Sequence, residues 1–215
     1  MSEFVVCAFY TPNYRDDIER LEISLKAFGH DYHFQEFERL PTWEQNTGIK
    51  PKFLLECLER FDGKDVLYLD ADAFVRRRIE TFEEFEGDIG LHFNAKGGSH
   101  IIRTGTIYLR NNRNSHQFMK DWIQAQASNL KFSDQDSFEL AYKQKQGTSF
   151  FNLPVEYVKI FDRDDVKPYV EHFQASRRSD NVKAFSKQRR KKQKYIGIFL
   201  VTNIVYLTLL VLCSR

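Results

Sequence analysis

The chain has 215 residues, 42% of them apolar and 29% charged, with a formal net charge of +2. This composition predicts a globular protein with enough length for one sizeable domain and a tail. Residues 177–194 and Arg215 hold ten of the 32 basic residues and only one of the 30 acidic residues, so residues 1–176 carry about −7. A body without a basic excess argues against nucleic acid as a partner.

Three cysteines, Cys7, Cys57 and Cys213, show no metal-ligand spacing, and their odd number fits a reducing compartment. Cys7 falls in a predicted strand and Cys57 in a predicted helix, where we expect both to be buried. The first residues carry neither a basic segment nor a long apolar run, so no signal peptide is predicted.

The first third of the chain alternates between strand and helix patterns. Residues 3–10, EFVVCAFY, predict a buried strand, and residues 11–29 open with turn chemistry and continue with apolar residues at helical spacing. Residues 31–37 predict a second strand, 50–61 a second helix and 66–69 a third strand. This order predicts an α/β fold with a mostly parallel central sheet.

Further strands and helices follow in the second half. Two strands are expected at 88–95 and 101–110, followed by helices over NSHQFMKDWIQAQAS and SDQDSFELAYKQ. Ser133 is the expected N-cap of the second helix, with acidic residues in its first turn. FFNLP, EYVKIF and PYVEHF predict late short strands. We therefore expect one domain, residues 1–176, and a basic linker, residues 177–194.

Two aspartates, Asp70 and Asp72, end the apolar strand in the sequence VLYLDADAFV. Unpaired buried carboxylates are costly, so this pair should lie where the strand meets solvent or a ligand. Ligands of open α/β sheets bind beyond the carboxyl ends of the strands, and paired carboxylates suit Mg²⁺ or Mn²⁺. The structural alternative is a turn in which aspartate is favoured for its local hydrogen bonding.

Residues 195–213, YIGIFLVTNIVYLTLLVLC, contain no charged residue. A helix of this length spans roughly 28 Å, close to the hydrocarbon thickness of a bilayer. The basic run at 187–194 directly precedes it, as is typical of the cytoplasmic flank of a membrane span. We predict a single-pass C-terminal transmembrane helix with the domain on the cytoplasmic side; the alternative is a buried core helix.

The ordered set of motifs resembles the GT-A nucleotide-sugar glycosyltransferases over nearly all of residues 3–178. VLYLDADAFV resembles their DxD strand end, and FYTPNY with the following ISL resembles the nucleotide-binding first strand and helix. RTGTIYLRNN resembles a strand that usually reads NSGVMLFRN, with Thr104 in place of the usual asparagine. SDQDSFELAY resembles the DQDxLN helix start, and EHFQASRR the terminal histidine segment. The resemblance implies a single GT-A-like, Rossmann-like domain.

The resemblance also implies a divalent cation, Mn²⁺ or Mg²⁺, beneath the donor diphosphate. Asp72 is the first choice for direct metal contact, while Asp70 either reaches the metal, directly or through water, or holds the ribose. His172 is implied as a further ligand, and the structural alternative is a partly buried histidine beside Phe173.

Donor and catalytic roles follow from the same resemblance. Asp136 is the candidate acid or base, and its structural alternative is compensation of charge at the helix N-terminus. Tyr10 is otherwise a core residue, and Lys50 is otherwise a solvated lysine beside a first-turn proline. The candidate donor-binding residues are Tyr10, Thr11, Tyr14, Lys50, Asp70, Gly105 and Gln135.

The sequence therefore predicts a metal-dependent glycosyltransferase of the hexosyltransferase type with a UDP- or GDP-sugar donor. Its expected acceptor is a glycan, a lipid-linked molecule or a protein at or near a membrane. The alternatives are a sugar-nucleotidyltransferase and a non-catalytic nucleotide-sugar-binding domain. A nucleotidyltransferase should carry a glycine-rich loop after its first strand, and FYTPNYRDD has no glycine.

Overall fold

The computed structural model describes residues 4–94, 101–163 and 165–175 of the chain. The chain divides into two units after Ala175, and all described residues belong to the first. The predicted linker and the predicted membrane helix lie outside the described residues. Within the described ranges, no helix combines the length and the apolar surface needed to cross a membrane.

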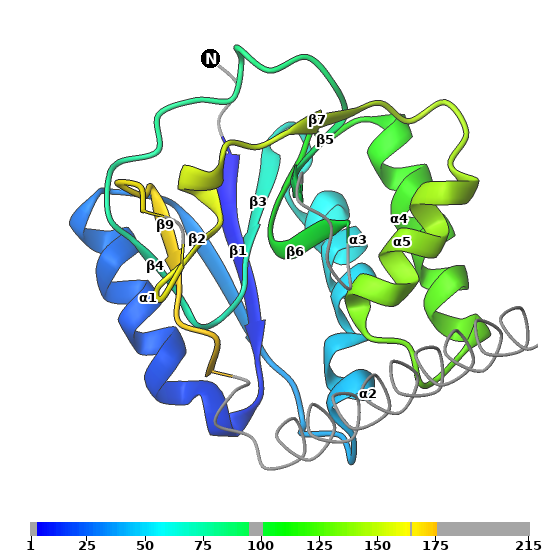
Figure 1. The fold of residues 1–215 in the computed structure, drawn as a ribbon, viewed down its shortest axis with the longest axis horizontal. Helices are drawn as coiled ribbons and strands as arrows, with labels where there is room; N and C mark the ends of the chain where they lie inside the picture. Colours follow the sequence, from blue (N-terminus) through cyan, green and yellow to red (C-terminus); the bar gives the residue numbers. More distant parts are fainter. Residues whose placement is uncertain (1–3, 95–100, 164, 176–215) are drawn as a thin grey trace, which may run out of the picture. The chain divides into compact units, whose positions relative to one another are not determined.

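A six-stranded sheet in the order β2-β1-β3-β6-β5-β7 forms the centre of this unit (Figure 1). Five of these strands run in one direction, and β6 runs antiparallel to its neighbours β3 and β5. The mostly parallel central sheet is therefore confirmed. The strands are β1 (Phe4–Tyr10), β2 (Tyr32–Glu36), β3 (Asp65–Leu69), β5 (Ile89–Phe93), β6 (Ile102–Leu109) and β7 (Phe150–Asn152).

Helices cover both faces of the sheet, because alternate residues of its central strands point to opposite sides. Val6 and Ala8 of β1 pack with the apolar face of α1 (Arg15–Ala27). Val5 and Cys7 pack with helices on the other face (Figure 1). These are α3 (Lys50–Arg60), α4 (Arg113–Ser128) and α5 (Asp134–Gln144). Cys7 and Cys57 are buried, as expected.

The carboxyl ends of β1 and β3 lie at the same edge of the sheet. The two strands are parallel and adjacent, with Cys7 opposite Tyr68. The chain leaves β1 through α1 on one face and enters β3 from α3 on the other. Such a switch point is where open α/β sheets bind their ligands. Thr11 and Asp70, which directly follow the two strands, therefore lie at the expected binding edge.

A second, three-stranded sheet in the order β4-β9-β8 was not expected as a separate unit. It contains β4 (Ala73–Val75), β8 (Lys159–Ile160) and β9 (Val170–His172). The expected strand over EYVKIF is partly wrong, because Val155–Tyr157 form the short 3-10 helix η2 and only two residues join the sheet. Strands of two or three residues show no periodicity, so pairing with distant residues decides them.

The remaining short elements lie in connections. The 3-10 helix η1 (Pro12–Tyr14) follows β1, and α2 (Trp43–Thr47) lies in the polar stretch before α3, where no element was expected. A capping box starts α2: the Thr42 side chain accepts a hydrogen bond from the backbone N–H of Gln45, and the Gln45 side chain accepts one from the backbone N–H of Thr42. This local pairing explains a helix of only five residues.

Asp88 ties the start of β5 to the segments that precede α4 and β7. Its carboxylate accepts hydrogen bonds from Ser149 N (2.8 Å), Ser149 Oγ (2.7 Å) and Asn112 Nδ2 (2.8 Å), and more weakly from Asn114. Burial acts to raise the pKa of the Asp88 carboxyl, but the hydrogen bonds outweigh it and the pKa is lowered. The ionised form is therefore part of the folded structure.

Replacing Asp88 with alanine should lower the free energy of unfolding by about 2 kcal/mol at pH 7, because the hydrogen bonds from Ser149 and Asn112 to the charged carboxylate are lost. The pKa is lower in the folded than in the unfolded state, so this stabilisation is present above about pH 4 and is lost as the pH falls through the folded pKa. Urea unfolding from pH 7 downward tests this. Asp62→Ala, at an exposed turn, is the control and should change stability by less than about 0.5 kcal/mol.

Candidate cation and donor site

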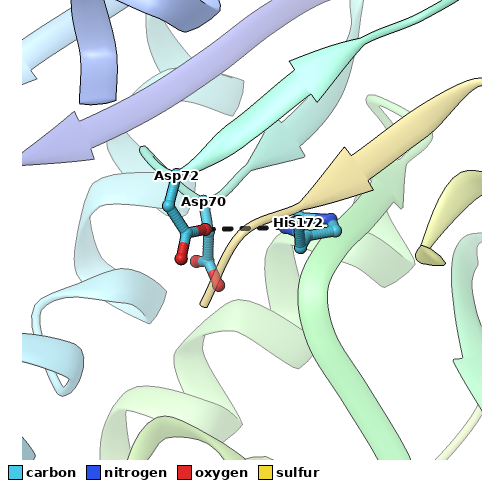
Figure 2. A group of neighbouring side chains, drawn as sticks. All are labelled: Asp70, Asp72 and His172. Carbon is cyan, nitrogen blue, oxygen red and sulfur yellow. Dashed lines mark ion pairs between the residues drawn. The ribbon is translucent and has the colours of Figure 1, made fainter. Parts of the chain in front are cut away.

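Asp70, Asp72 and His172 converge at the carboxyl end of β3. One ligand atom of each lies within 4.8 Å of the others. Figure 2 shows the two carboxylates projecting from the turn after β3, with the imidazole of His172 facing them from β9. The turn is fixed on both sides, since Asp70 N donates to Gly105 O (2.9 Å) and Ala73 N donates to Asp70 O (2.9 Å).

The small sheet brings His172 to the two aspartates across a hundred residues of sequence. Strand β4 begins directly after Asp72 and pairs with β9 in antiparallel register, so that Ala73 lies opposite His172. The Nδ1 atom of His172 lies 3.7 Å from Asp72 Oδ1. The expectation that these three residues lie together is therefore met in the geometry, and their function as ligands is a prediction.

Thr106 sets the hydrogen-bonding state of the His172 ring. Its hydroxyl donates to Tyr157 O (2.7 Å) and lies 2.8 Å from His172 Nε2. A hydroxyl has a single proton, so Nε2 must be the donor in the second contact. In the neutral ring, Nδ1 then carries its lone pair toward the aspartates, which is the tautomer a metal ligand requires. Thr106 was missed from the sequence, where nothing distinguishes it from other strand residues.

Gly105 allows β6 to pass directly beneath the cluster. A Cβ atom at this position would lie 3.1 Å from Asp70 Oδ2 and 3.2–3.3 Å from the His172 ring. These contacts are tighter than ordinary van der Waals distances, so a side chain here would displace the carboxylate or the imidazole. The glycine expected to bind donor thus has a steric function toward two of the candidate ligands.

Gly105→Ala should weaken Mn²⁺ binding about tenfold, because it pushes Asp70 or His172 away by a few tenths of an ångström. The fold should lose only about 1 kcal/mol, since the crowded atoms lie at the edge of the sheet. Titration calorimetry with Mn²⁺ and thermal unfolding measure the two effects separately. Unchanged Mn²⁺ affinity in a folded variant would contradict the steric argument.

The two aspartates differ in their electrostatic surroundings. Burial acts to raise the pKa of Asp72, but contact with His172 and the hydrogen bond from Ala175 N outweigh it, and the pKa is lowered. The pKa of Asp70 is raised, chiefly by burial and by the nearby carboxylates, while Lys50 opposes this effect. The Asp70 side chain is still 38% exposed, so water limits the size of the shift. Asp72 is therefore the better candidate for an anionic ligand.

Lys50 lies behind the cluster instead of pointing to solvent. Its buried Nζ forms a close ion pair with Asp134, lies 3.0 Å from Asp70 Oδ1 and donates to Thr104 O (3.1 Å). It also lies 4.9 Å from the ring centre of Tyr68, whose hydroxyl donates to Asp70 Oδ1. Burial lowers the pKa of Lys50, but the two carboxylates outweigh this and raise it. Its charge is already shared between two carboxylates.

The DQD segment at the start of α5 points two aspartates in different directions. Asp134 accepts from Lys50 and from Thr104 Oγ1 (2.8 Å), so it belongs to the network beside Asp70. Asp136 accepts from Ser133 N and Oγ, completing a capping box. This places Asp136 at the helix N-terminus, where the structural alternative was compensation of charge, and its catalytic role is a prediction. Sequence reasoning assigned Asp134 only helix-terminal charge, because its partners come from distant segments.

The other candidate donor residues lie along the same edge. Gln135 Nε2 donates to Ile102 O (2.8 Å) at the start of β6. Thr11 is buried, donates to Asn13 Oδ1 and accepts from Tyr14 N, which shapes the turn after β1. The pKa of Tyr10 is raised by partial burial and by contact with Glu36. Parallel pairing of β1 with β3 places this turn beside Asp70.

Solved structures share this arrangement of elements. The fold is similar to a glycosyltransferase involved in the glycosylation of the major capsid of PBCV-1, with a TM-score of 0.65 and 13% identity over 84% of this chain and 96% of that one. The glycosyltransferase GlyE of Streptococcus pneumoniae TIGR4 is similar with a TM-score of 0.55 and 15% sequence identity, over 80% of this chain and 55% of GlyE. The galactosyltransferase LgtC, solved with donor and acceptor sugar analogs, has a TM-score of 0.50 and 12% sequence identity. The match covers 79% of this chain and 87% of LgtC.

Sequence comparison adds the family to the fold. No curated protein matches the chain. The family model for nucleotide-diphospho-sugar transferases matches residues 7–196, which include every candidate site residue and all of both sheets except the first three residues of β1. The chain therefore belongs to the nucleotide-diphospho-sugar transferase family and is a glycosyltransferase of the nucleotide-sugar type.

Proposed function

We propose that the chain is a metal-dependent hexosyltransferase that moves a sugar from a UDP- or GDP-sugar to an acceptor hydroxyl. The observation that supports this most is the convergence of Asp70, Asp72 and His172 at the carboxyl end of β3. Two carboxylates and one imidazole form a donor set suited to Mn²⁺, with Mg²⁺ as the harder alternative. Gly105 leaves room for the set, and Thr106 turns the His172 ring toward it.

Asp72 and His172 would hold the cation directly, and Asp70 would hold it directly or through water. When bound, the cation offsets the negative charge that develops on the departing nucleoside diphosphate. Thr106 keeps Nδ1 of His172 available, and Ala175 N keeps the Asp72 carboxylate ionised. Tyr10, Thr11 and Tyr14, at the end of the adjacent strand, are proposed to contact the nucleoside.

Lys50 and Asp134 are proposed to position the donor sugar beside Asp70. Both are buried and joined to Asp70 through the Nζ of Lys50. A buried network of this kind holds its side chains in place without the cost of an unpaired charge only if every member is paired. Here each carboxylate has at least two partners. This role differs from the direct contact with donor that the sequence analysis expected of Lys50, because the ammonium already faces two carboxylates.

A panel of nucleotide sugars with and without Mn²⁺ tests the reaction class. We expect one UDP- or GDP-sugar to raise the melting temperature only with Mn²⁺ and to release nucleoside diphosphate when an acceptor is supplied. A nucleotidyltransferase would instead require a nucleoside triphosphate and release pyrophosphate. Donor binding with no diphosphate release across glycan, lipid-linked and protein acceptors would favour the non-catalytic alternative.

We also propose a C-terminal membrane anchor over residues 195–213, with the domain on the cytoplasmic side and a membrane-proximal acceptor. The support is the uncharged 19-residue segment, the basic run that precedes it and the end of the family match at residue 196. Anchoring would concentrate the enzyme beside lipid-linked or membrane-bound acceptors.

The full chain should sediment with membranes and resist carbonate extraction. Ile204→Arg with Leu207→Arg should release it, because each central arginine raises the cost of insertion by about 3 kcal/mol. A chain that ends at Asp180 should stay in the supernatant and still bind donor. Recovery of the full chain in the supernatant, or failure of the shortened chain to fold, would place the apolar segment in a protein core.

A further inference from the structure

The turn that follows His172 contains an unusual backbone conformation. Gln174 has φ +50°, and among the described residues it is the one non-glycine in the left-handed region. L-residues other than asparagine, aspartate and glycine seldom adopt this conformation, because Cβ crowds the following carbonyl. Such residues persist where the surrounding contacts fix them, and they gather at functional sites.

Two backbone amides of this turn donate hydrogen bonds to Asp72. Phe173 N donates to the backbone carbonyl of Asp72 (3.1 Å), and Ala175 N donates to its Oδ2 atom (2.6 Å). The other carboxylate oxygen, Oδ1, lies 3.7 Å from His172 Nδ1. Residues 172–175 therefore surround Asp72 with one side chain and two backbone amides, and the left-handed residue lies between the two amides.

We propose that residues 172–175 form a clasp that orients Asp72 for cation binding, with Gln174 as its positioning residue; this rests on the proposed cation site. The hydrogen bond from Ala175 N holds Oδ2 on the side of the turn. This leaves Oδ1 facing His172 and the side of Asp70, where the cation would be held. The left-handed backbone of Gln174 directs the Ala175 amide toward a carboxylate 103 residues earlier in the sequence.

Three substitutions at position 174 separate the backbone from the side chain. Gln174→Gly removes the side chain and Gln174→Asn shortens it by one methylene, and both residues accept the left-handed region. Gln174→Val has nearly the size of asparagine but a β-branched side chain that disfavours positive φ. On the full chain in detergent, we expect Mn²⁺ affinity within about twofold of wild type for the glycine and asparagine variants. The valine variant should bind Mn²⁺ about tenfold more weakly.

Hydrogen exchange at the Ala175 amide tests the clasp without metal. The amide should exchange slowly in the wild type and in the glycine and asparagine variants, and quickly in Gln174→Val and in Asp72→Ala. Equal exchange in the wild type and Asp72→Ala would overturn the clasp. Equal Mn²⁺ affinity in all three position-174 variants, with Mn²⁺ binding lost in Asp72→Asn, would overturn the clasp and leave the cation site intact.

The remaining outcomes separate failure of the cation site from failure of the clasp. No Mn²⁺ binding by the wild type, with slow exchange at Ala175, would refute the cation site and with it the proposed purpose of the turn. If Gln174→Val fails to fold, the asparagine variant decides: weakened Mn²⁺ binding there would show that the glutamine side chain, and not the backbone, carries the effect, which overturns the proposal. Retained binding and slow exchange in that variant, together with fast exchange in Asp72→Ala, support it.

Discussion

Replacing Asp72 with asparagine is expected to abolish Mn²⁺-dependent donor binding while the fold is retained. The substitution removes one negative charge and almost no volume, and the amide oxygen can still accept from Ala175 N. The free energy of unfolding should therefore change by no more than about 1 kcal/mol. Loss of a charged ligand from a three-residue set should weaken Mn²⁺ binding by roughly a hundredfold or more, and transfer activity should fall with it.

Titration calorimetry with Mn²⁺, alone and with the donor identified by the panel, measures this effect. Asp62→Asn is a matched control, because it removes the same charge from an exposed turn just before β3, at the opposite end of that strand. The control should bind Mn²⁺ and donor as the wild type does. Mn²⁺-dependent donor affinity that is unchanged in Asp72→Asn would refute the role of Asp72 as a metal ligand.

The long elements could be predicted from the sequence because each carries its own pattern. Strand β3 is an unbroken apolar run, and α3 repeats apolar residues at helical spacing from Phe53 to Leu58. Both patterns follow from burial against the sheet, which acts within a single element. The strands of the small sheet have no such pattern, since Lys159–Ile160 and Val170–His172 are ordered by pairing with one another and with β4.

The residues of the candidate site also differ in whether the local sequence could predict them. The place of Asp70 and Asp72 follows from the local sequence, because a carboxylate pair cannot continue a buried strand. The roles of Lys50 and Asp134 do not follow, since 84 residues separate them and each has an ordinary structural explanation in its own helix. Thr106 was missed for the same reason: only the return of β9 beside β6 gives its hydroxyl a histidine partner.

Lys50→Met is expected to lower the free energy of unfolding by about 3–5 kcal/mol, because it leaves the buried carboxylate of Asp134 without its cation. The Lys50 side chain is 3% exposed, and its partner Asp134 is 6% exposed, so water cannot replace the lost pairing. Methionine keeps the length and apolar stem of lysine, which limits the loss of packing. Lys52→Met is the control two residues along α3: its side chain is 76% exposed, and its pair with Glu56 at 3.9 Å should contribute almost nothing.

A double substitution separates unpaired charge from lost packing. Adding Asp134→Asn to Lys50→Met removes the carboxylate that the lysine left unpaired, and the asparagine can still accept from Thr104 Oγ1. The double variant should therefore be more stable than Lys50→Met alone, although each substitution by itself destabilises the wild type. Urea unfolding of the four proteins gives the coupling energy. A double variant that is less stable by the sum of the two single effects would mean that Lys50 stabilises the domain through its apolar stem, and that the ammonium contributes no net pairing with Asp134.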